Sequence, residues 1–213
     1  MSTIYGGAIM RDMSQLHVFL DKVAKTRLPE GPSDIAQTII RTAVGEYVAA
    51  GYLTRQTRVL DVGCGSGMAL MEMKKHGIEA HGLAVGENAR TLRAMGFHII
   101  ESEQEFTGLP DASYDFLWSR HMLSQSVMPA FALSEYHRLL KPDGLLYVEV
   151  AAPDTDAHHE RNPNSLSQLP VVLWQHLFYR TGFIQFRPII QQMLTLKGGG
   201  KDTYWCFLLQ RTK

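Results

Sequence analysis

Apolar residues recur at helical spacing in the part of the chain before residue 57. They fall three and four positions apart between residues 14 and 26, and again between residues 33 and 50. Pro29, Gly31 and Pro32 separate the two stretches and interrupt the periodicity. The pattern predicts two amphipathic helices, the second of which ends near Gly51.

From residue 57 onward, short apolar runs alternate with helical stretches. The expected strands are residues 58–62, 78–85, 97–101, 114–119 and 145–151, and the expected helices are residues 69–76, 87–95 and 129–140. Such an alternation requires right-handed crossovers and a mostly parallel sheet with helices on both faces. The predicted fold class is therefore α/β, with ligands bound at the carboxyl ends of the strands.

The last third of the chain has a different pattern. Residues 152–168 are rich in Pro, Asp, His and Asn and have no clear period, so a loop is predicted there. A helix over residues 171–180 and strands over 183–190 and 203–209 are expected to follow. A connection of hairpin length joins these two strands, which predicts an antiparallel edge to the sheet.

Length and composition place these elements in one domain. The chain has 213 residues, of which 45% are hydrophobic and 20% charged, enough apolar surface for a substantial core. We expect residues 1–55 to form a helical cap that belongs to the same domain as residues 56–213. The 21 basic residues balance the 21 acidic ones, so no overall field favours nucleic acid or an anionic membrane as a partner.

The two cysteines are too few for a disulfide framework. No apolar stretch approaches the roughly 20 residues that cross a bilayer, and the first residues lack the pattern of an export signal. These features predict free thiols, a cytoplasmic protein and no membrane partner. They give no indication of the oligomeric state.

A glycine-rich segment follows the first expected strand. Residues 59–67 read VLDVGCGSG, in which Gly63, Gly65 and Gly67 alternate with other residues just before a predicted helix. Glycines let backbone N–H groups approach a ligand closely, and a helix N-terminus favours an anionic group such as a carboxylate. A structural turn with surplus glycine is the alternative. A dinucleotide fingerprint requires a last glycine where Met68 stands, which weakens a nicotinamide oxidoreductase as a second alternative.

Three segments in order resemble the class I S-adenosylmethionine-dependent methyltransferases. Residues 59–67 resemble the motif I of that family, residues 109–118 (LPDASYDFLW) its passage before the fourth strand, and residues 139–146 (LLKPDGLL) its turn into the fifth strand. The resemblance implies a Rossmann-like, seven-stranded, mostly parallel sheet. It also implies bound S-adenosyl-L-methionine and methyl transfer to a small or medium-sized acceptor molecule.

The resemblance also implies positions for the cofactor. The segment around its methionine end corresponds here to Asp61, Gly63, Cys64, Gly65 and Gly67. The loop that contacts adenine corresponds to Glu105, as a hydrogen-bond acceptor, and Phe106, as a backbone donor and apolar wall, and the end of the fourth strand contributes Ser119. An ordinary packing role for Phe106 is the alternative.

One position departs from the family. The acid that usually ends the second strand and binds the ribose hydroxyls is replaced by Ala84. Charge-assisted hydrogen bonds contribute about 1.5 to 3 kcal/mol each, so this loss weakens cofactor binding unless another group substitutes. Glu87 is the nearest acid, and a first-turn electrostatic role in a helix is its simpler explanation. The departure therefore supports an alternative function, a non-catalytic protein of this fold that acts through a partner.

His121 is the candidate catalytic base. It follows the fourth expected strand, and an imidazole titrates near neutral pH, so it can take a proton from the acceptor. A structural histidine is the alternative. Relatives often have an acid and a second histidine shortly after this position, where this chain has Ser124 and Gln125.

The loop of residues 152–168 is expected to lie over the acceptor pocket. It concentrates carboxylates and imidazoles, yet their spacing matches no metal signature. We therefore predict a polar lid and no metal site.

Overall fold

The computed structural model describes residues 13–26, 34–196 and 198–213. The helices are α1 (Ser14–Thr26), α2 (Asp34–Ala49), α3 (Met68–Lys75), α4 (Gly86–Ala94), α5 (Pro129–Leu139) and α6 (Val171–Arg180), with short 3-10 helices η1 (Leu123–Gln125) and η2 (His159–Arg161). The strands are β1 (Val59–Val62), β2 (His81–Ala84), β3 (Ile99–Glu101), β4 (Tyr114–Arg120), β5 (Leu140–Ala151), β6 (Phe183–Gln185), β7 (Ile190–Thr195) and β8 (Lys201–Arg211). Within the described residues, no helix is both long and apolar enough to span a membrane.

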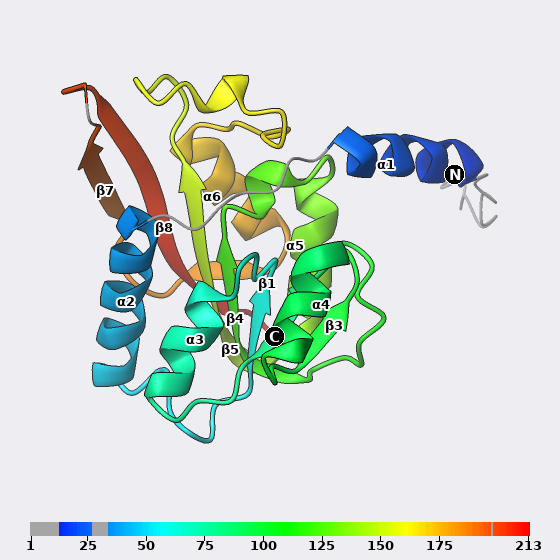
Figure 1. Cartoon of the computed structure of the whole chain (residues 1–213), viewed down its shortest axis with the longest axis vertical. Coiled ribbons are helices and arrows are strands. Elements are labelled where there is room, and N and C mark those ends of the chain that lie inside the picture. Colours follow the sequence, from blue (N-terminus) through cyan, green and yellow to red (C-terminus); the bar gives the residue numbers. More distant parts are fainter. Residues whose placement is uncertain (1–12, 27–33, 197) are drawn as a thin grey trace, which may run out of the picture.

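All strands belong to one central sheet (Figure 1). Its order is β3-β2-β1-β4-β5-β8-β6, and β7 pairs with β8 beside β6. Strands β1 to β5 run parallel to their neighbours, whereas β8 is antiparallel to β5, β6 and β7. The predicted α/β class and antiparallel edge are confirmed.

Among the described residues, the sheet has eight strands rather than the seven predicted. The expected strand over residues 183–190 is divided into β6 and β7, both of which pair with β8. Between them the N–H groups of Phe186 and Arg187 both donate to the carbonyl of Leu208, which marks a bulge. Pro188 follows and has no N–H to donate, so one continuous strand is interrupted here.

The segment of residues 139–146, expected to form the turn into the fifth strand, lies almost wholly within β5, which begins at Leu140. The register between β4 and β5 shifts between Tyr114 and Phe116, and Asp143 has a positive φ of 62°. Where the sequence predicted a turn, the structure therefore has an irregular beginning of β5.

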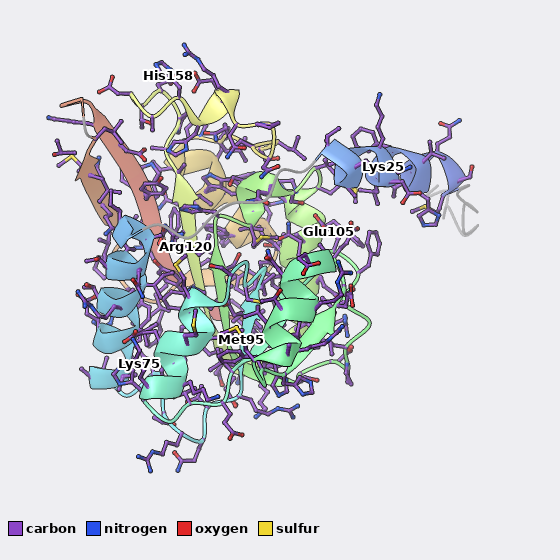
Figure 2. The ribbon with its side chains drawn as sticks, in the orientation of Figure 1. Lys25, Lys75, Met95, Glu105, Arg120 and His158 are labelled. Atoms are coloured by element: carbon purple, nitrogen blue, oxygen red, sulfur yellow. The ribbon has the colours of Figure 1, made fainter. Side chains whose placement is uncertain are left out.

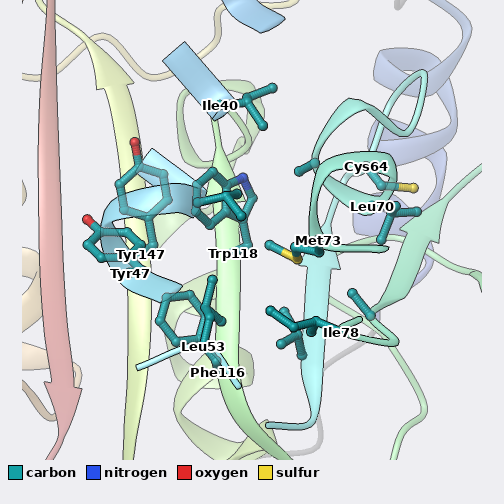
Figure 3. Close-up of a cluster of buried hydrophobic side chains, with 14 of the residues drawn as sticks. Ile40, Tyr47, Leu53, Cys64, Leu70, Met73, Ile78, Phe116, Trp118 and Tyr147 are labelled. Carbon is teal, nitrogen blue, oxygen red and sulfur yellow. The ribbon is translucent and has the colours of Figure 1, made fainter. Parts of the chain in front are cut away.

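Helices cover both faces of the sheet, and each face has its own core. Helices α2 and α3 pack on one face, where aromatic side chains from three elements meet: Tyr47, Phe116, Trp118 and Tyr147 (Figure 3). Helices α5 and α6 pack on the other face. Helix α1 has no buried residues and lies beside the main body (Figure 1).

Strand alternation assigns side chains to these faces. In β4, Phe116 and Trp118 belong to the α2 core and Leu117 to the α5 core. Because successive side chains of a strand point to opposite faces, Arg120 lies on the α2 face and Ser119 on the α5 face. The carboxyl end of β4 therefore presents different chemistry to the two layers.

Candidate functional site at the carboxyl ends of the strands

The glycine loop connects β1 to α3. Its three glycines have positive φ angles of 71°, 51° and 80°, a region that L-residues with side chains rarely adopt. An added Cβ would lie 2.1 Å from Sδ of Met122 at Gly63 and 2.4 Å from Leu92 at Gly67, whereas at Gly65 nothing lies within 4 Å. Helix α3 begins at Met68 without a side-chain cap. The loop therefore offers open space at Gly65 and uncapped amides of the helix N-terminus beside it.

Asp61 lies on β1, two residues before the first glycine. It is 3% exposed, and burial raises its pKa from 3.8 to about 7, although the charge of Arg120 opposes the shift. Strand β1 is buried along its whole length, which explains why this carboxyl has so little contact with water. Asp61 therefore places a carboxyl that titrates near neutral pH beside the glycine loop.

We expect the Asp61→Asn variant to change the pH dependence of stability. Between about pH 4 and pH 7 the folded protein retains a proton at Asp61 that the unfolded chain has lost, so wild-type stability falls as pH rises through this window. Asparagine has no such proton. The unfolding free energy of the variant relative to wild type should rise by about 4 kcal/mol from about pH 4 to pH 8 in urea titrations. A constant difference would contradict the raised pKa.

Cys64 and Ala84 both face the protein interior. An added Cβ at Gly82 would lie 2.7 Å from Sγ of Cys64, so the thiol packs against β2, and burial raises the pKa of this thiol. Ala84 ends β2 and pairs in register with Glu101 at the end of β3. The carboxylate of Glu101 accepts a hydrogen bond from the N–H of Gly86 at 3.3 Å and pairs with Arg93 at 2.8 Å. An acid thus stands next to Ala84 on the neighbouring strand.

The two residues predicted to contact adenine differ in exposure. Glu105 is buried, and its Oε1 accepts a hydrogen bond from Ser126 at 2.5 Å. Phe106 is 42% exposed, its ring lies 5.3 Å from that of Phe131, and its N–H donates to the carbonyl of Glu103 at 3.2 Å. Phe106 thus presents an apolar side chain to solvent, while the Glu105 carboxylate has a partner inside the protein.

Ser119 lies fully buried on the α5 face. Its hydroxyl is 3.3 Å from that of Tyr136, which in turn donates to Oε1 of Gln104. The Gln104 amide donates to the carbonyl of Met122 at 3.0 Å. This hydrogen-bond chain connects the end of β4 to the loop after β3.

His121 lies where the chain leaves β4. Its φ is 61°, in the left-handed region, and its N–H donates to the carbonyl of Glu149 at 2.8 Å. Its Nε2 is 2.9 Å from Oε1 of Glu149, and Nε of Arg120 is also 2.9 Å from that oxygen. Tyr147 donates to the other carboxylate oxygen at 2.9 Å. His121 is therefore fixed against a fully buried acid by both its backbone and its ring.

Glu149 is charged at neutral pH despite its burial. Burial alone would raise its pKa, but the hydrogen bond from His121 and the charge of Arg120 together lower it. Arg120 is 16% exposed along its side chain and lies near the centre of the molecule (Figure 2). The Glu149 carboxylate thus contacts both the Arg120 guanidinium and the His121 imidazole.

The loop of residues 152–168 reaches the same region. His159 pairs with Asp202 of β8 at 2.7 Å, and its ring contacts Tyr204, whose ring stacks on His121. His158 is half exposed at the outer end of the loop (Figure 2). Among the described residues, no three of His, Cys, Asp and Glu gather as a metal site would require.

Sequence reasoning identified His121 but none of its partners. Glu149 could have been found, because it is an acid within the apolar run of β5. A charge buried there needs a partner. Met122 gave no signal, because its contact with Gly63 depends on the return of the chain from β4 to the glycine loop.

A family model described as a methyltransferase domain matches residues 24–191. The chain belongs to this family. This membership confirms the predicted family and fold class and identifies the chain as a methyltransferase domain. It does not support the nicotinamide oxidoreductase alternative.

Individual relatives are distant. A protein of Haemophilus influenzae described as uncharacterized is 26% identical over 186 residues, which are 78% of this chain and 71% of that protein. A malonyl-[acyl-carrier protein] O-methyltransferase of Methylovorus sp. is 29% identical over 143 residues, 53% of this chain and 48% of that enzyme. The chain spans less than half the length of the curated relatives that carry a named activity.

Solved structures share the fold. One is the 1,6-didemethyltoxoflavin-N1-methyltransferase of Burkholderia thailandensis, solved with bound 1,6-didemethyltoxoflavin and S-adenosylhomocysteine. It has a TM-score of 0.66 at 16% identity, and the alignment covers 97% of this chain and 93% of that enzyme. A SAM-dependent methyltransferase of Archaeoglobus fulgidus also has a TM-score of 0.66 at 16% identity, and the alignment covers 92% of this chain and 99% of that protein.

Proposed function

We propose that this domain transfers a methyl group from S-adenosylmethionine to an O–H or N–H group of a small-molecule acceptor, with His121 as the base. The observation that carries the proposal is the contact of His121 with the buried carboxylate of Glu149. The next residue, Met122, packs on Gly63, so the chain at His121 passes beside the glycine loop.

The glycine loop has features that suit the methionine end of S-adenosylmethionine. The open space at Gly65 leaves room for a ligand, and the uncapped N-terminus of α3 provides amides for a carboxylate. We propose contacts from this loop, namely from Asp61, Gly63, Cys64, Gly65 and Gly67. Phe106 and Glu105 remain the proposed residues at adenine, and Ser119 remains a proposed contact at the end of β4.

His121 has one nitrogen available for the acceptor. Glu149 is ionised and only accepts hydrogen bonds, so Nε2 of His121 must be the donor. In a neutral imidazole the single N–H is therefore on Nε2. Nδ1 then has the lone pair and takes the proton of the acceptor, while Glu149 stabilises the resulting imidazolium. When bound, S-adenosylmethionine supplies an electrophilic methyl group on a positively charged sulfur. Glu149 is thus a positioning residue.

Two further parts of the proposal concern the whole protein. We propose a cytoplasmic location, because both cysteines are free and buried. We also propose that residues 1–55 act as a cap of the same domain, supported by the packing of α2 on the sheet below the candidate site.

The proposal is tested with S-adenosylhomocysteine and with methyl transfer. We expect saturating S-adenosylhomocysteine to raise the melting temperature, because a ligand that binds only the folded state stabilises it. We also expect release of S-adenosylhomocysteine from S-adenosylmethionine with small acceptors that carry O–H or N–H groups. Stabilisation without any turnover would favour the non-catalytic alternative, and no stabilisation would overturn cofactor binding.

We expect Glu101 to replace the ribose acid that is absent at Ala84. Glu101 lies in register beside Ala84 and is already held by Arg93 and the N–H of Gly86. Glu101→Gln should weaken S-adenosylhomocysteine binding about tenfold in calorimetric titrations, the loss expected for one charge-assisted hydrogen bond.

The matched control is Glu87→Gln. Glu87 is 77% exposed and pairs with Arg90 within its own helix, so its loss should leave affinity unchanged. If Glu87→Gln weakens binding and Glu101→Gln does not, the ribose acid lies on α4.

A further inference from the structure

A second imidazole–carboxylate pair lies beside His121, and the proposed mechanism does not use it. Nε2 of His159 is 2.7 Å from Oδ1 of Asp202, and Tyr204 hydrogen-bonds to the same carboxylate. The Tyr204 ring stacks on His121 at 5.0 Å and 11°, and the His159 ring lies 5.4 Å from it at 71°. Both imidazoles therefore contact one aromatic ring, His121 at its face and His159 edge-on.

The sheet register brings the two pairs together. Asp202, Tyr204 and Cys206 alternate along β8 and so share one face, and Cys206 pairs directly with Glu149 of β5. Both carboxylates consequently lie on the α2 face at the same end of the sheet.

The loop that carries His159 is hydrogen-bonded at both ends. Near its start, Ala152 and Asp156 donate backbone hydrogen bonds to the carbonyls of Thr203 and Lys201. Near its end, the N–H groups of residues 166 and 167 both donate to the carbonyl of Ser124, in the 3-10 helix that follows His121. These bonds fix the loop against β8 and η1, so His159 has a defined position relative to His121.

The same nitrogen atom is the acceptor in both rings. The charged form of Asp202 is favoured because the hydrogen bonds from His159 and Tyr204 outweigh its burial and lower its pKa, as at Glu149. Ionised carboxylates only accept, so Nε2 is the donor in both rings and Nδ1 of a neutral ring has the lone pair.

Both Nδ1 atoms are without a partner in the part of the chain that the structure describes. Within residues 13–26, 34–196 and 198–213, neither has a hydrogen-bond partner, and neither is enclosed as a buried orphan. The two side chains are 22% and 20% exposed. Two accessible lone pairs therefore lie on neighbouring rings.

We propose that the acceptor carries two hydrogen-bond donor groups, each O–H or N–H, one of which binds Nδ1 of His121 and the other Nδ1 of His159. The inference rests on the proposed function, since it assigns His159 to the same acceptor site. The substrate class is thus a dihydroxy, hydroxy-amino or diamino compound, and His159 discriminates against molecules with a single donor.

The first test measures the tautomers in the protein alone. Nitrogen-15 NMR of histidine-labelled protein, with signals assigned through His121→Asn and His159→Asn, should show hydrogen on Nε2 and none on Nδ1 in both rings at neutral or mildly basic pH. Hydrogen on Nδ1 of either neutral ring overturns the proposal. This measurement needs no cofactor, so its outcome is independent of the proposed function.

The second test compares ligands that differ by one donor. Catechol, resorcinol and hydroquinone place two hydroxyls at three spacings, and the monomethyl ether of each removes one donor. In the presence of S-adenosylhomocysteine, at least one diol should bind about tenfold more tightly than its ether, and His159→Asn should abolish that preference.

The matched control is His158→Asn on the same loop. His158 is half exposed, pairs with Glu160, and has a positive φ of 51° that asparagine tolerates. It should retain the preference of the wild type. Equal binding of all three diols and their ethers, or an unchanged preference in His159→Asn, overturns the inference. If S-adenosylhomocysteine itself stabilises the protein, the proposed cofactor site survives either result.

Discussion

Replacement of Gly65 by valine should eliminate detectable binding of S-adenosylhomocysteine. Gly65 is the glycine of the loop at which an added Cβ meets nothing within 4 Å, so the valine side chain would occupy the open space assigned to the methionine end of the cofactor. Loss of one buried contact costs a few kcal/mol, and steric exclusion removes several at once. We expect affinity to fall at least about a hundredfold, measured by calorimetry and by the loss of ligand-induced thermal stabilisation.

Backbone strain alone must be separated from this effect. Gly65 has a φ of 51°, and a β-branched residue in the left-handed region costs about 1 to 3 kcal/mol. Gly96→Val is the matched control, because Gly96 follows α4 with a φ of 83° and also has nothing within 4 Å of an added Cβ. It should lower the melting temperature of the free protein but retain ligand stabilisation. Equal loss of binding in both variants would place the cofactor elsewhere.

The layer architecture was predictable because it depends on local periodicity. The alternation of apolar runs and helical stretches between residues 57 and 151 predicted β1 to β5 in order, and a hairpin-length connection predicted the antiparallel pairing of β8. The division of β6 from β7 was not predicted. It depends on Pro188 and a bulge opposite Leu208, and hydrophobic periodicity registers neither as a break.

The candidate site was predictable only where a motif marks it. The glycine loop and the position of His121 follow from short segments at a strand end. The partners of the imidazoles do not, because Glu149 is 28 residues from His121 and Asp202 is 43 residues from His159. These contacts are set by strand register, which a single sequence does not fix. The pairing of Ala84 with Glu101, the acid expected to bind the ribose, is likewise set by strand register.

Replacement of His121 by asparagine should reduce turnover far more than cofactor affinity. Asparagine tolerates the φ of 61° at this position, yet it has no group that takes a proton near neutral pH. Removal of a general base typically costs about 10²- to 10⁴-fold in rate, and we expect kcat to fall within this range for the acceptor found in the turnover assay. The dissociation constant for S-adenosylhomocysteine should remain within about threefold of wild type, since His121 is not among the proposed cofactor contacts.

Two companion variants make this result specific. His176→Ala removes an exposed imidazole on α6, which packs on the sheet face opposite to that of Glu149, and should keep the wild-type kcat. Glu149→Gln still offers an oxygen to Nε2 of His121 but no charge, so its kcat should fall by only about tenfold, with NMR showing hydrogen still on Nε2. Full turnover in His121→Asn would remove the imidazole from the mechanism. Methyl transfer would then depend on positioning alone, as for an acceptor that is already ionised in solution.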